Sequence, residues 1–167
     1  GRKELFMIIG LSGYMKSGKD TMGKMIQYFL GYKQRFPQSD RSFEDWLKNV
    51  GNDGEWQIRK FAGRLKEVAS LMTGIPVEKF EDQDFKDGYM PDEWNRTEIF
   101  VGDTESPHKE KMEMTVRQFL QRLGTDAVRH KVHEDAWVIA AMADYRESDN
   151  WIFTDCRFPN EAQAIKD

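Results

Sequence analysis

The amino-acid sequence predicts an α/β fold in which a parallel β-sheet is flanked by helices. A continuous apolar run at residues 5–9 leads into a glycine-rich turn, as a strand buried on both faces does. Later runs at residues 56–62 and 151–155 are each followed by a helical pattern, and this alternation is typical of a parallel sheet. The length of 167 residues fits one domain, residues 1–167, with room for an inserted subdomain.

The first strand, its loop and a helix follow one another directly. After Lys19, apolar residues recur at the spacing of one helical face: Met22, Met25, Ile26, Phe29 and Leu30. A second helix is expected at residues 42–50, because Ser42 to Asp45 resembles a capping box and turn residues follow it. The second strand leads into a helix at residues 64–73, which a glycine and a proline end.

The second half of the chain begins with a long polar stretch. Residues 81–114 show no period of 2 or 3.6, so we expect a mobile excursion or lid there. Thr115 and Gln118 form a capping box, and the helix they begin is expected to stop near Gly124. An alanine-rich helix at residues 135–145 and a short helix after the third strand complete the predicted elements.

The composition argues against a nucleic-acid partner, a membrane span and an intramolecular disulfide. There are 25 Lys and Arg against 29 Asp and Glu, a net charge of −4, so no broad basic face is available for a polymeric nucleic acid. No apolar run approaches the roughly 20 residues of a membrane span. The single cysteine, Cys156, excludes an intramolecular disulfide. We therefore expect a cytoplasmic protein with small-molecule partners, and a homodimer is one oligomeric state open to it.

The turn after the first strand carries a phosphate-loop pattern. Residues 13–19 fit G-x-x-x-x-G-K, with Asp20 where Ser or Thr is usual. Glycines let backbone N–H groups point inward and the next helix adds its positive end, so the segment predicts a cradle for polyphosphate oxygens with Lys19 as a mobile cation. The strand–loop–helix setting favours this interpretation over an ordinary glycine turn. The predicted nucleotide-binding residues are Gly13, Tyr14, Lys16, Ser17, Gly18, Lys19, Asp20 and Thr21.

Three segments in this order carry a further signal. They are Ser17-Gly18-Lys19-Asp20-Thr21, residues 121–129 with Leu-Gly-Thr-Asp at their centre, and residues 154–161 with Asp-Cys-Arg-Phe-Pro-Asn-Glu. Together they resemble the phage-type deoxynucleoside monophosphate kinases. Residues 61–66 also look like that family's segment after its second strand, although Gly63 stands where an acid is expected.

The resemblance implies a P-loop NTPase-type three-layer sandwich that moves the γ-phosphoryl group of ATP to a deoxynucleoside monophosphate, giving the diphosphate and ADP. It implies Mg²⁺ as well, and Mg²⁺ would bind at Asp20 or Thr21, because it prefers hard oxygen ligands; the sequence leaves both open. The family continues with further strands after the position of Asp167, so the resemblance also implies a C-terminally truncated chain.

Phosphoryl transfer depends mainly on positioning and on positive charge around the moving group, so arginines are the residues to seek. By the resemblance, Arg122 and Arg129 would clasp the acceptor monophosphate with Thr125 and Asp126 nearby, since a planar guanidinium matches phosphate oxygens. The alternative is that they are solvated helix charges.

Two further pairs of residues are candidates. Arg64 and Lys66, at the exit of the second strand, either contact the acceptor or belong to a solvated face. Asp155 ends an apolar strand and resembles a Walker-B acid that holds Mg²⁺ or orients the attacking oxygen. Arg157 either reaches the transferring phosphate or pairs with Asp155 or Glu161.

Two other functions stay open at this stage. Animal-type phosphomevalonate kinases also carry a Ser-Gly-Lys-Asp loop, so the acceptor could be another small phosphorylated molecule; the Leu-Gly-Thr-Asp block favours the nucleotide. A nucleotide-binding protein that retains the cradle without transferring a phosphoryl group is the second alternative.

Overall fold

The computed structural model describes residues 6–14, 17–103 and 106–167, and the chain divides into two compact units. The first unit combines Gly1–Gly63 with Trp137–Asp167, and the second is Arg64–Ala136. Both ends of the chain therefore build one unit, and the second unit is inserted between them.

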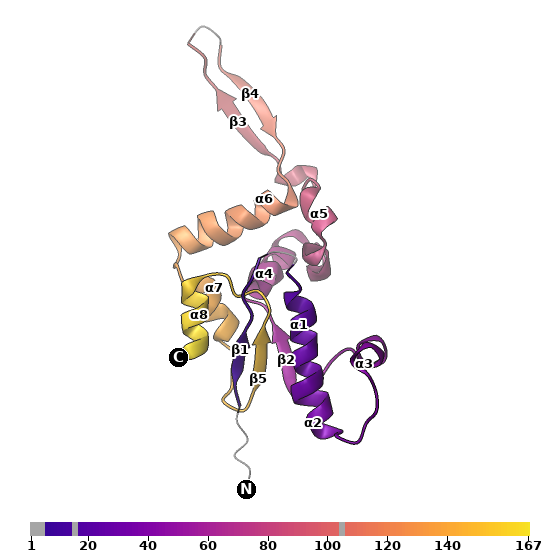
Figure 1. Ribbon diagram of the computed structural model, residues 1–167. Helices are drawn as coiled ribbons and strands as arrows, with labels where there is room; N and C mark the ends of the chain where they lie inside the picture. Colours follow the sequence, from indigo (N-terminus) through magenta and orange to yellow (C-terminus); the bar gives the residue numbers. More distant parts are fainter. Residues whose placement is uncertain (1–5, 15–16, 104–105) are drawn as a thin grey trace. The chain divides into compact units, whose positions relative to one another are not determined.

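The first unit contains a three-stranded parallel sheet. Its strands are β1 (Ile8–Gly10), β2 (Trp56–Arg59) and β5 (Asn150–Phe153), in the order β1-β5-β2 (Figure 1). Ile152 of β5 lies opposite Ile9 on one side and Ile58 on the other. A parallel sheet flanked by helices confirms the predicted α/β class and is compatible with a P-loop type of sandwich.

Helices cover both faces of this sheet. α1 (Lys19–Ile26) packs on the face that carries Ile58 and Thr154. α7 (Ala136–Met142) and α8 (Pro159–Lys166) pack around Trp151 and Phe153 on the opposite face, because side chains alternate along a strand. The centre of the sheet, Trp151 to Phe153, is almost completely buried.

The face of α1 that contacts the sheet consists of small and polar residues. Gly23 and Gln27, the residue that follows α1, are buried, and a Cβ atom at Gly23 would lie 2.7 Å from Thr154 Cγ2. The apolar stripe found in the sequence lies on another face, where Met22 is 51% exposed and Phe29 is 57% exposed. Apolar periodicity therefore located the helix but not its buried face, because glycine adds nothing to that pattern.

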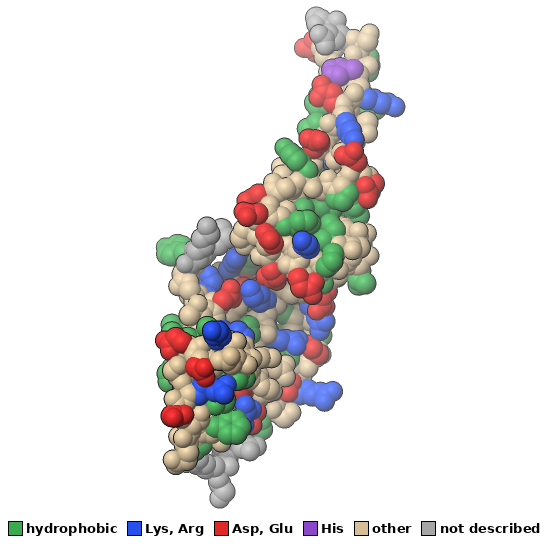
Figure 2. Space-filling model, turned by 90° about the vertical axis from the view of Figure 1, so that its right-hand side faces the viewer, with side chains coloured by type: hydrophobic (Ala, Val, Ile, Leu, Met, Phe, Trp, Pro, Cys, Tyr) green, Lys and Arg blue, Asp and Glu red, His purple; other side chains and the backbone are tan. Residues whose placement is uncertain are grey.

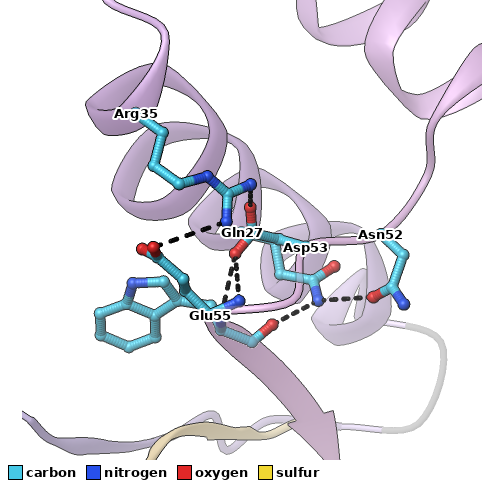
Figure 3. A network of polar contacts seen from close by, with 6 residues as sticks. Gln27, Arg35, Asn52, Asp53 and Glu55 are labelled. Carbon is cyan, nitrogen blue, oxygen red and sulfur yellow. Dashed lines mark hydrogen bonds and ion pairs between the residues drawn. The ribbon is translucent and has the colours of Figure 1, made fainter.

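A buried polar network joins the continuation of this helix to the loop before β2 (Figure 3). α1 continues through η1 (Gln27–Tyr32) and α2 (Lys33–Arg35). The Asp53 carboxylate accepts hydrogen bonds from Arg35 Nη2 at 2.6 Å and from the backbone N–H groups of Glu55 and Trp56 at 2.9 and 3.0 Å. Gln27 Nε2 donates to the Trp56 carbonyl at 2.6 Å. These bonds fix the start of β2 against the helix.

In the sequence, α3 (Phe43–Asn49) lies between α2 and β2. The Ser42 side chain caps its N-terminus, as predicted.

The second unit has an apolar core of its own. It contains α4 (Gly63–Thr73), α5 (Gln83–Asp87) and α6 (Val116–Gln121), with 3₁₀ turns η2 (Val77–Glu81) and η3 (Asp92–Trp94). Its buried residues are Ala69, Phe80, Met90, Met114, Val116 and Phe119. The capping box of Thr115 and Gln118 is confirmed, since each side chain accepts the other residue's N–H.

The segment predicted as a lid consists of a packed part and a hairpin. Phe85 and Trp94 lie against the core of the second unit. β3 (Arg96–Phe100) and β4 (His108–Met112) form an antiparallel hairpin (Figure 1). Their side chains are mostly exposed. Sequence analysis missed these strands because neither face of the hairpin is apolar enough to produce a clear alternation. That residues 81–114 act as a lid stays a prediction. That residues 1–167 form a single domain also stays a prediction.

The helical backbone that begins with α6 does not stop near Gly124, where the sequence predicted its end. The helix continues as a π-helical segment, η4 (Arg122–Arg129), in which Gly124 is buried. A Cβ atom at Gly124 would lie 2.8 Å from Leu65 Cδ2, so the glycine allows close packing on α4. The prediction was wrong because it took a packing glycine for a helix stop.

The surface agrees with the mixed charge of the sequence. Acidic and basic side chains are interspersed over the face that Figure 2 shows. Within the described residues, no helix is long and apolar enough to cross a membrane.

Candidate functional site

The carboxyl ends of the three parallel strands bring together residues from distant parts of the sequence. The loop after β1, Lys60 after β2 and Asp155 after β5 all lie at this edge of the first unit. In open α/β sheets, ligands bind outside the carboxyl ends of the strands. This edge is therefore the candidate site.

Hydrogen bonds close the loop between β1 and α1. Lys19 Nζ donates to the carbonyl oxygens of Gly13 at 2.7 Å and Tyr14 at 3.0 Å, and the Ser17 N–H donates to the Tyr14 carbonyl at 3.1 Å. A Cβ atom at Gly13 would lie 2.8 Å from Ser17 Oγ, so a side chain at that position would require the Ser17 side chain to move. The Lys19 ammonium is thus held at the loop. Lys16, also predicted to bind nucleotide, lies outside the described residues.

The N-terminus of α1 begins at a glycine. Gly18 precedes the helix with φ 83°, in the left-handed region that favours glycine, and it has no side chain that could cap the first turn. The backbone N–H groups of the first turn have no intrahelical acceptor, and such groups are the donors that bind phosphate at helix N-termini. Asp20 and Thr21 lie in this turn with exposed side chains, and Asp20 Oδ1 is 3.5 Å from Lys60 Nζ.

The Asp155 carboxylate accepts hydrogen bonds from the turn that follows β2. Its Oδ1 accepts the Phe61 N–H at 2.8 Å, and its Oδ2 accepts the Ala62 N–H at 3.0 Å. Sequence analysis did not anticipate this structural contact. Each carboxylate oxygen has a second lone pair, so the contact leaves the carboxylate able to accept a further ligand.

The donors at this edge suit a magnesium ion that arrives with a nucleotide. Asp20, Thr21 and Asp155 offer only hard oxygen atoms, and Mg²⁺ is usually bound by one or two carboxylates together with substrate phosphates and water. In the part of the chain that the structure describes, no three His, Cys, Asp or Glu side chains form a group that could hold a metal ion.

The residues after Asp155 have local structural roles. The backbone N–H groups of Arg157 and Phe158 donate to Glu161 Oε1 at 2.9 and 2.8 Å. The Arg157 side chain is exposed. Burial, together with the carboxylates of Glu161 and Asp155, raises the pKa of the Cys156 thiol. A raised pKa keeps the thiol protonated and therefore weakly nucleophilic.

The predicted acceptor-binding residues of η4 lie in the second unit. Arg122 is half-buried and its Nη1 lies 3.3 Å from Met114 Sδ. Thr125 and Arg129 are half-buried, whereas Asp126 is exposed. All four belong to the π-helical segment, and such segments are rare and frequently found at functional sites.

Two predicted cations of α4 are paired with acids in this structure. Arg64 Nη1 lies 3.0 Å from Glu67 Oε2. Lys66 Nζ lies 2.8 Å from Glu81 Oε1, and the Lys66 side chain is only 12% exposed. A role in acceptor binding would therefore require Lys66 to exchange Glu81 for a phosphate.

One known protein is similar to this chain over nearly its whole length. It is the deoxynucleoside-5′-monophosphate kinase of Escherichia phage T5, 22% identical over 180 aligned positions that cover 96% of this chain and 72% of that protein. No protein-family model matches the chain. No solved structure matches it either. The chain is thus distantly similar to a nucleotide kinase.

The sequence interpretation did not include Lys60, which lies at the same edge. It named Arg64 and Lys66 further along the chain, although Lys60 comes directly after β2, and Asp155 lies two residues after the end of β5. The rule that ligands bind at the carboxyl ends of strands would have found it.

Proposed function

We propose that this protein is a nucleotide kinase that transfers the γ-phosphoryl group of ATP to a deoxynucleoside 5′-monophosphate and releases the diphosphate and ADP. The observation that carries the proposal is the junction between β1 and α1. There Lys19 begins the helix and its ammonium is held by the preceding loop, beside a helix N-terminus whose cap residue is a glycine.

Each group at this junction has a role in the proposed reaction. The N–H groups of the first turn of α1 bind phosphate oxygens, and Lys19 balances the charge of the terminal phosphates. Asp20, Thr21 and Asp155 would hold Mg²⁺, which supplies further positive charge to the phosphates when it is bound. Arg157, exposed at the same edge, is free to turn toward the transferring group.

The residues proposed to bind the acceptor belong to the second unit. Arg122 and Arg129 would bind the acceptor phosphate, with Thr125 and Asp126 beside it, and Arg64 and Lys66 would add contacts from α4. The similarity to the phage T5 enzyme supports a deoxynucleoside monophosphate as the acceptor over phosphomevalonate. The proposed partners are small nucleotides rather than polymeric nucleic acid, in the cytoplasm.

An acceptor panel tests the proposal. The purified protein is incubated with Mg-ATP and, separately, each of the four common deoxynucleoside monophosphates or phosphomevalonate, and ADP release is followed. We expect ADP release only with one or more of the deoxynucleotides. Release with phosphomevalonate alone would support the other kinase, whereas ATP binding without any acceptor-dependent release would support a binding protein without transfer activity.

A further inference from the structure

Lys60 extends the row of β2 side chains that faces α1. Ile58, two residues earlier, belongs to this row, since a Cβ atom at Gly23 of α1 would lie 3.4 Å from Ile58 Cδ1. Arg59 points to the opposite face, where its guanidinium lies 4.1 Å from the centre of the Trp151 ring. Strand alternation thus separates the two cations, because Arg59 packs on the sheet and Lys60 is directed to α1.

The Lys60 ammonium lies beside the first turn of α1. Its Nζ is 3.5 Å from Asp20 Oδ1, and the Lys60 side chain is 31% exposed, against 75% for Asp20. An ion pair of such exposed groups contributes little to folding. Its effect is to hold a positive charge next to the helix N-terminus, which already attracts anions.

Lys19 and Lys60 approach this helix end from different elements. Lys19 is held by the loop carbonyls of Gly13 and Tyr14, whereas Lys60 comes from the end of β2 and contacts Asp20. A triphosphate spreads its charge over many oxygens, and one ammonium acts on them as a single point charge. A second ammonium from the sheet would therefore neutralise oxygens that Lys19 does not contact.

We propose that Lys60 is a second phosphate-binding cation of this site, which Asp20 holds in place until a nucleotide polyphosphate binds. The proposal rests on the proposed function, since it assigns a further contact to the same nucleotide site. The polyphosphate and the Asp20 carboxylate compete for the same ammonium, so Lys60 changes partner when the nucleotide binds.

Titration calorimetry without metal tests this role, with ATP and with inorganic tripolyphosphate, which has no base or sugar. We expect Lys60→Gln to weaken the binding of both ligands by about tenfold, as expected for the loss of a charged hydrogen bond. Lys60→Arg keeps the charge and should retain most of the affinity. Lys48→Gln removes an exposed lysine of α3 and serves as the matched control. Thermal unfolding of each variant verifies that the fold is intact.

The outcomes separate this inference from the proposed function. If the wild-type protein binds ATP and Lys60→Gln binds both ligands equally well, Lys60 is not a phosphate contact and the proposed function is unaffected. A loss with ATP but not with tripolyphosphate would also overturn the inference, because Lys60 would then act on another part of the nucleotide. If wild-type protein binds neither ligand with or without Mg²⁺, both proposals fail.

Discussion

Replacing Asp53 by alanine should destabilise the first unit more than any change of an exposed ion pair. The Asp53 side chain is completely buried and accepts three hydrogen bonds, from Arg35 and from two backbone N–H groups at the start of β2. Removing one partner of a buried ion pair costs about 3–5 kcal/mol. Arg35 is 34% exposed and can recover hydration, so we expect the lower end, about 3 kcal/mol.

Urea unfolding followed by tryptophan fluorescence measures this loss, because Trp46, Trp56 and Trp151 are all buried in the first unit. For a chain of this size, about 3 kcal/mol corresponds to a fall of roughly 6–12 °C in Tm. Asp45→Ala is the control: its pair with Arg41 is exposed on both sides and should change stability by at most about 1 kcal/mol. A loss below about 1 kcal/mol for Asp53→Ala would refute the view that this network fixes β2 against the helix.

Three further changes test separate parts of the structure. Lys19→Met should lower phosphoryl-transfer turnover by at least roughly 10²–10³-fold, as the loss of one electrostatic stabiliser does, and an unchanged rate would contradict its assigned role. Gly124→Val should cost about 1–3 kcal/mol in chemical unfolding, since a Cβ atom there would lie 2.8 Å from Leu65 Cδ2; Leu65→Ala in the same chain should recover part of that loss. Because burial raises its pKa, the Cys156 thiol should react with iodoacetamide at pH 8 far more slowly in the folded protein than in urea, and equal rates would disprove that protection.

Local sequence patterns predicted much of the fold because they depend on near neighbours. The caps at Ser42 and Thr115 and the strand–loop–helix at the N-terminus are all set by residues within a few positions of one another. The β3–β4 hairpin had no such signal, since its exposed faces carry charges and apolar residues together.

The candidate site was predictable in part for the same reason. The glycines and lysine of the loop belong to one short segment, so their spacing alone indicated the cradle. Lys60 and the backbone contacts of Asp155 depend on the strand order β1-β5-β2, which no local spacing specifies.

By itself, the sequence determined the α/β class, the helix starts at Ser42 and Thr115 and the phosphate-loop pattern, because these follow from residue type and short-range spacing. Only the tertiary structure decided that Gly23 and Gln27, rather than the methionine and phenylalanine stripe, form the buried face of this helical segment. The physical reason is that close approach to a sheet selects small side chains, a requirement imposed by the partner element and invisible in the helix's own hydrophobic pattern.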